Sequence, residues 1–162
     1  MMDAVAHYFG AERAGALLLL VIGLVAFEAA STFWRKSRLP QAKGAAAALA
    51  LVAAIQLSVG ATVFVRSPGD QQRVNLAIQH NRLHIERHEI PRMQQVMRYF
   101  EIYRGIEIGM LVLGLLLTVF ARRGSFARGA GMGLLPQAAV MLVLDALSEH
   151  RSAAYLAWLQ AL

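Results

Sequence analysis

Four apolar runs dominate the chain and constrain its fold more than any other feature. They occupy residues 14–34, 45–65, 106–120 and 134–147. A helix needs about 20 residues to cross about 30 Å of hydrocarbon, and each run reaches roughly that length with its less polar flanks. Because 57% of the residues are hydrophobic and only 16% are charged, a small soluble core could not bury them all. The runs predict an all-α integral membrane protein, a bundle of four transmembrane helices.

The predicted boundaries place the whole chain, residues 1–162, in a single membrane domain. The transmembrane helices are expected at about 12–34, 44–65, 101–121 and 129–149, with an extramembrane helical segment between the second and third at about 67–100. The first run follows Asp3 and Glu12 and contains Glu28, which is not the pattern of a secretory signal peptide. We therefore expect the first run to be a retained helix.

Positive charges predict the orientation in the membrane. The loops after the first and third runs carry cations and no acids, namely Arg35, Lys36, Arg38, Lys43, Arg122, Arg123 and Arg128. Loops of this kind face the cytoplasm. We expect a multi-pass protein of the cell membrane, in a bacterial inner membrane, with both termini outside. The net charge of +6 fits this topology and contact with the lipid bilayer, and no basic helix with interleaved aromatics predicts nucleic-acid binding.

The long connection between the second and third runs is predicted to form two helices. Ser67 as N-cap and Pro68 at the first helical position favour a helix that runs to about Glu89, where Pro91 then breaks it. This helix has two narrow apolar stripes on opposite faces: Val74, Ala77, Ile78 and Ile85 on one, and Leu76 and Leu83 on the other. Two stripes favour a helix held between two surfaces. One of these would belong to a partner membrane protein or to a second copy of the chain.

Three histidines on the same predicted helix form the strongest metal motif. His80, His84 and His88 fall within an arc of about 80°, a spacing that permits zinc, copper or iron. The alternative, which we favour, is a solvated helix surface, because most of the residues between these histidines are polar or charged. The spacing also differs from the His-Glu-x-x-His pattern of metalloproteases. We therefore predict no cofactor, with a divalent metal at these histidines as the alternative.

A second candidate site lies at the outer ends of the third and fourth helices. It comprises six charged residues: Arg98, Glu101, Arg104, Glu107, Asp145 and Glu149. The turn between the two helices is short, so they should be antiparallel neighbours that bring these residues to the same depth. We expect ion pairs of Arg104 with Asp145 or Glu149, and of Arg98 with Glu101 or Glu149.

The depth of two of these acids decides what the cluster means. A charge at the centre of a membrane helix costs about 2.5–3.5 kcal/mol, so Glu107 and Asp145 need partners or water. The cluster therefore either pins the bundle through ion pairs, or lines a polar cavity that binds a cation, a proton or a polar headgroup.

Two further polar residues interrupt the apolar runs. Glu28 is expected to reach the membrane interface and pair with Arg35 or an arginine at the end of the third helix, or else to form an embedded proton or cation site. Gln56 is expected to form a hydrogen bond inside the bundle. Glycines should allow close helix contacts: Gly105 and Gly109 in the third helix, and Gly129, Gly131 and Gly133 in the fourth.

Function is less constrained by the sequence than location. No catalytic motif is evident, and the chain has no cysteine for thiol chemistry. We expect a non-enzymatic membrane protein that binds a partner protein or a small polar ligand at its outer face. The alternatives are a small proton- or cation-coupled transporter or channel-like protein, and a membrane metalloenzyme at the histidines. The absence of an internal repeat disfavours a transporter, and too few ligands disfavour a metalloenzyme.

Overall fold

The computed structural model describes residues 2–80, 83 and 85–162. Within them, four long helices run antiparallel in chain order: α1 (Met2–Lys36), α2 (Pro40–His80), α4 (Ile90–Phe120) and α5 (Phe126–Gln160). A short π-helical turn, η1 (Ile85–Glu89), leads directly into α4. The prediction of an all-α bundle built from four long apolar helices is confirmed.

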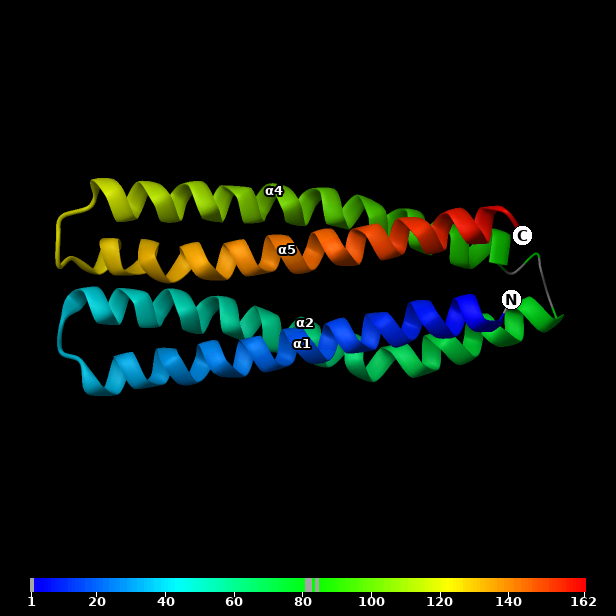
Figure 1. The fold of residues 1–162 in the computed structure, drawn as a ribbon, viewed down its shortest axis with the longest axis horizontal. Helices are drawn as coiled ribbons and strands as arrows, with labels where there is room; N and C mark the ends of the chain where they lie inside the picture. Colours follow the sequence, from blue (N-terminus) through cyan, green and yellow to red (C-terminus); the bar gives the residue numbers. More distant parts are fainter. Residues whose placement is uncertain (1, 81–82, 84) are drawn as a thin grey trace.

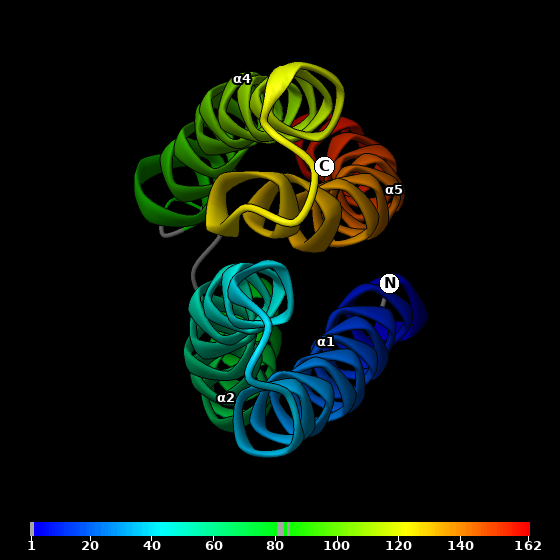
Figure 2. The ribbon, with the colours of Figure 1, turned by 90° about the vertical axis from the view of Figure 1, so that its left-hand side faces the viewer.

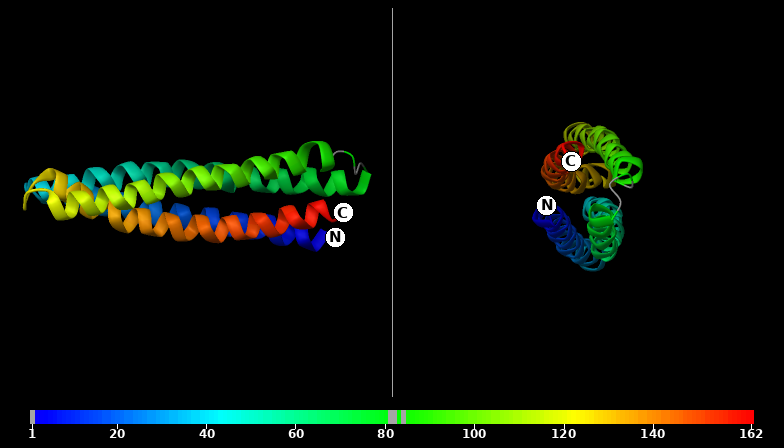
Figure 3. Two further views of the ribbon diagram at one scale, coloured as in Figure 1. Left: turned by 90° about the horizontal axis from the view of Figure 1, so that it is seen from above. Right: turned by 90° about the vertical axis from the view of Figure 1, so that its right-hand side faces the viewer.

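The helices form two hairpins that lie side by side (Figure 1). Helices α1 and α2 form one hairpin, α4 and α5 form the other, and α2 packs along α5 to join them. The two hairpin loops lie at one end of the bundle, while both termini, the end of α2 and η1 lie at the other. Figure 3 shows the same division from above. We call these the loop end and the terminal end.

The two hairpin loops are short because capping residues start the next helix at once. Ser37 Oγ accepts a hydrogen bond from the Leu39 N–H at 3.3 Å, just before α2 begins. Ser125 is the N-cap of α5, and its hydroxyl accepts a hydrogen bond from the Arg128 N–H at 3.3 Å. Gly124 precedes it with φ +78°, a conformation that favours glycine.

Small residues line the contacts between helices. At the loop end, α2 crosses the start of α5 (Figure 2). A Cβ at Gly44 would clash with the Phe126 backbone, and one at Gly129 would clash with the Gln41 backbone. Gly131 also lies close to Gly114 of α4, although this approach is less tight. By contrast, a Cβ at Gly105 or Gly109 would have no atom of another described residue within 4 Å. The expected close helix contact at these two glycines is therefore not found among the described residues.

A cluster of buried apolar residues lies at the terminal end. It combines residues from both hairpins: Val5, Tyr8, Phe9, Val74, Ala77, Ile85, Met93, Tyr155 and Leu159. Elsewhere the buried apolar residues are mostly alanines, and large apolar side chains such as Leu24, Val25 and Leu113 point outward. The bundle therefore has a small-residue interior in its middle and an aromatic core at one end.

The predicted helix start at Ser67 is wrong. Helix α2 continues through Pro68 without a break. Ser67 is 1% exposed, and its hydroxyl donates a hydrogen bond to the Phe9 carbonyl at 3.2 Å. Asp70 forms ion pairs with Arg66 and Arg73 in place of a cap. Packing against α1 and these ion pairs stabilise the helix across the proline.

The predicted break at Pro91 is also wrong. The chain leaves α2 at His80 and resumes in η1 at Ile85, so the reversal precedes the proline. Pro91 lies in the first turn of α4, directly after η1, and the helical path continues through it. Of the two predicted stripes, Val74, Ala77 and Ile85 are buried, whereas Leu76 and Leu83 are exposed.

Candidate functional site

A chain of alternating charges crosses the terminal end and connects the two hairpins. It runs through six residues: Glu12, Arg66, Asp70, Arg73, Glu89 and Arg92. We call it the charge ladder. Its three acids and three arginines balance, so the ladder as a whole is neutral.

The first half of the ladder belongs to the α1–α2 hairpin. Arg66 lies 3.6 Å from Glu12 of α1 and 3.0 Å from Asp70, one turn further along α2. Asp70 also accepts from Arg73 at 3.1 Å. The spacings i, i+4 and i, i+3 place these three α2 residues on one helix face.

The second half crosses to the other hairpin through Glu89. Its carboxylate lies 3.7 Å from Arg73 of α2 and accepts a bidentate pair from Arg92 of α4, with Nε at 2.9 Å. The Glu89 side chain is only 4% exposed. A buried carboxylate needs such partners, because removing it from water is costly. Glu89 therefore fixes α2 to the start of α4.

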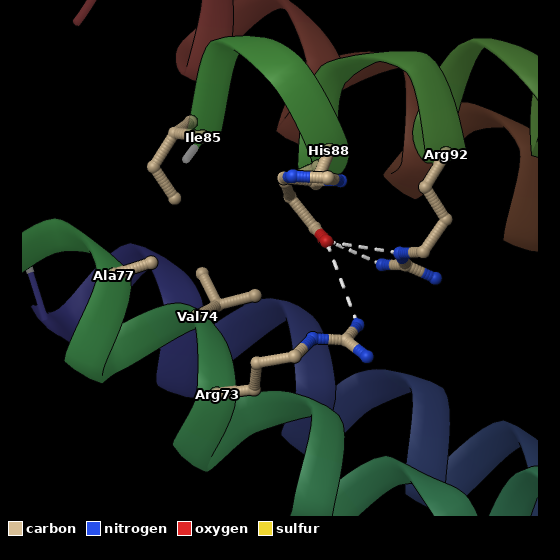
Figure 4. A pocket seen from close by; sticks show the side chains of 7 residues that line it. Arg73, Val74, Ala77, Ile85, His88 and Arg92 are labelled. Carbon is tan, nitrogen blue, oxygen red and sulfur yellow. Dashed lines mark hydrogen bonds and ion pairs between the residues drawn. The ribbon is translucent and has the colours of Figure 1, made fainter. Parts of the chain in front are cut away.

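A pocket of about 250 Å³ opens beside this junction. Its apolar floor is formed by Val74, Ala77 and Ile85, and its polar rim by Arg73, His88, Glu89 and Arg92. Figure 4 shows Arg73 and Arg92 reaching toward each other from opposite sides, with dashed lines converging between them. The pocket combines an apolar base with two guanidinium groups and one carboxylate.

The arginine at the open side of the pocket keeps hydrogen-bonding capacity. Both ion pairs of Arg73 among the described residues use one nitrogen, Nη2, and its side chain is 51% exposed. A guanidinium has five N–H donors in a planar fork. Arg73 can therefore donate to a ligand without leaving the ladder.

Two of the three predicted metal-binding histidines, His80 and His88, lie in different helical elements. Helix α2 ends at His80, and η1 begins at Ile85. His84 and the His80 side chain lie outside the described residues, and His88 is exposed at the rim of the pocket. Within the described part of the chain, no three histidine or acidic side chains gather as metal ligands. The metal site stays a prediction.

The predicted charged cluster on α4 and α5 separates into different environments. Arg104 pairs with Glu149 across the two helices, with Nη1 3.1 Å from Oε2. Arg98 and Glu101 are exposed and form no ion pair within the described residues. Glu107 is 2% exposed and lies against Asp145 of α5, and no arginine of the described chain forms an ion pair with either acid.

The other two predicted polar residues are also placed. Glu28 and Arg35 lie 3.7 Å apart at the surface, with both side chains largely exposed. Gln56 is fully buried and donates through Nε2 to Gln137 Oε1 at 3.0 Å, which ties α2 to α5. Gln137 also borders an apolar groove of about 340 Å³ between α1, α2 and α5. Its amide is already bonded to Gln56, so the groove offers little polar chemistry.

Comparisons with known proteins add no family. No protein family, curated protein or solved structure matches this chain.

Sequence reasoning missed the charge ladder. The signal was present in the spacing of Arg66, Asp70 and Arg73 and in that of Glu89 and Arg92, which are all three or four residues apart. The bond between Glu89 and Arg73 could not be read in this way, because it depends on where the chain reverses after α2.

Proposed function

We propose that this is a multi-pass membrane protein. Four helices of the described chain have the length and composition to cross a bilayer. The supporting observation is the reversed distribution of side-chain size, with alanine and glycine between the helices and leucine, valine and phenylalanine outside. Such a surface would aggregate in water but is suited to lipid.

The proposed orientation places the loop end in the cytoplasm and the terminal end outside. The cations of both hairpin loops, including Arg35, Lys36, Arg122 and Arg123, gather at the same end of the bundle (Figure 1). A shared side for these cations is what a positive-inside topology requires. The charge ladder and its pocket then belong to the outer face.

At this outer face the protein binds a small ligand that carries an anionic group. The pocket at Arg73 and Arg92 is the observation that supports this proposal. Its volume of about 250 Å³ is below the ~300–1,000 Å³ of drug-sized sites, so the ligand is small. The unused N–H donors of the Arg73 guanidinium favour a carboxylate or phosphate, while Val74, Ala77 and Ile85 favour a short apolar body.

Calorimetric titration of the purified protein tests the proposal. Small mono- and dicarboxylates and inorganic phosphate are the probes, with a small alkylammonium ion as the control of opposite charge. Arg73→Gln should weaken binding about tenfold or more, because a hydrogen bond to a charged group contributes about 1.5–3 kcal/mol. Arg87→Gln, which removes an exposed cation from η1, should leave the affinity unchanged. Equal loss in both variants, or no binding of any anion, contradicts the proposal.

A second candidate function is proton- or cation-coupled transport. The buried Glu107, which faces an acid and no arginine among the described residues, favours it. Binding of the chain to a partner membrane protein, or to a second copy of itself, stays a prediction.

A further inference from the structure

The contact between Glu107 of α4 and Asp145 of α5 cannot exist between two ionised groups as it stands. Glu107 is 2% exposed, and neither of its carboxyl oxygens has a hydrogen-bond donor among the described residues. The side chain that faces it is the Asp145 carboxyl group. An ionised carboxylate only accepts hydrogen bonds, so two of them leave each other unsatisfied and repel.

Among the described residues, no cation forms an ion pair with Glu107 or Asp145. Arg104, one turn outward on α4, is bound to Glu149. Glu149 is a further negative charge that acts on Asp145. Arg151 of α5 donates to Ser148 at 2.9 Å and lies against Gly15 of α1. The charged groups of η1 are about 27 Å away along α4, at about 1.5 Å per residue.

We infer that Glu107 and Asp145 form a one-proton site, in which a single shared proton joins the two carboxyl groups at neutral pH. The proton comes from water and forms one O–H bond, which donates to the facing carboxylate. The shared proton gives the buried Glu107 the hydrogen bond that it otherwise lacks. It also changes the net charge of the pair from −2 to −1. The proton site is separate from the pocket at Arg73 and does not depend on the proposed ligand.

Infrared spectroscopy of the membrane-reconstituted protein tests this site. A protonated carboxyl group has a C=O band distinct from that of a carboxylate, and the wild-type protein should show such a band at pH 7. For an ordinary glutamate at that pH, the ionised form exceeds the protonated form by more than about 100-fold. Glu107→Gln and Asp145→Asn should each abolish the band, because the amide then donates the hydrogen bond. Glu101→Gln, the exposed acid on α4, should leave it in place.

Isotope labelling keeps the test decisive if a variant does not fold. In wild-type protein, ¹³C at the side-chain carboxyl carbon of either glutamate or aspartate should shift part of the protonated band. Absence of the band at pH 7 would overturn the inference, as would a band that survives both Glu107→Gln and Asp145→Asn. A band that appears only when Na⁺ and K⁺ are replaced by choline would mean that the pair holds a metal cation, which also overturns it.

Discussion

The phenol rings of Tyr8 and Tyr155 lie parallel, with centroids 4.1 Å apart and an interplanar angle of 6°. Phe9 packs edge-on against both rings, and the Tyr8 hydroxyl lies 3.4 Å from Ser152 Oγ. This stack joins the first helix of the chain to the last. Like the charge ladder, it connects the two hairpins at the terminal end.

Tyr155→Ala should destabilise the bundle strongly. Tyr155 is 4% exposed, and truncating a buried aromatic ring costs about 3–5 kcal/mol through lost contacts and the cavity left behind. Thermal unfolding in detergent, followed by circular dichroism, measures the loss. Tyr99→Ala removes a ring that is 43% exposed and should have a much smaller effect. Similar losses in the two variants would mean that the aromatic core does not hold the terminal end together.

Glu89→Ala should destabilise the protein by about 3–5 kcal/mol, because it leaves Arg92 and Arg73 without their shared carboxylate. Glu86→Ala, an exposed acid in the same π-helical turn, is the matched control and should have little effect. Chemical unfolding of both variants provides the comparison. Arg92→Met should cost less in the Glu89→Ala background than in the parent, as in a double-mutant cycle. Additive losses would contradict the pairing of Glu89 with Arg92.

Gly129→Ala should separate α2 from α5 at the loop end. The added methyl group would meet the Gln41 backbone, which cannot move aside as a side chain can, so the cost is about 1–3 kcal/mol or more. Gly105→Ala has open space and should be neutral or slightly stabilising, because alanine favours helix. Melting temperatures of the two variants test this difference. A harmless Gly129→Ala would show that the close crossing does not form.

Cysteine labelling tests the proposed orientation, since the chain contains no cysteine of its own. A cysteine at Lys36 or Arg123 should be shielded from an impermeant thiol reagent in intact cells. A cysteine at Gln72, which is exposed at the terminal end, should react. The reverse pattern would place the terminal end in the cytoplasm.

Much of the fold could be predicted from apolar run length alone. Each run lies within one long helix. The prediction from the short turn before Ser125, that α4 and α5 are antiparallel neighbours, is confirmed. The same turn brought Arg104 to the level of Glu149. These features depend on local sequence and helix geometry, which a single chain displays directly.

The remaining features depend on tertiary contacts that local patterns do not encode. The motif at Ser67 and Pro68 has the composition of a helix start, yet contact with Phe9 carries α2 through it. Gly105 and Gly129 sit in similar small-residue patterns, but only Gly129 faces another helix. The partners of Glu89 likewise follow from a chain reversal that no motif marked.

The small-residue interior sets which changes natural variants of this protein can accept. Outward positions such as Leu24, Val25 and Leu113 need only remain apolar, so leucine, isoleucine, valine and phenylalanine should interchange there freely. Positions such as Gly44, Gly129 and Ala53 have no spare volume and should be nearly fixed. In homologous sequences, the slowly evolving positions between the helices should therefore be those with the smallest side chains.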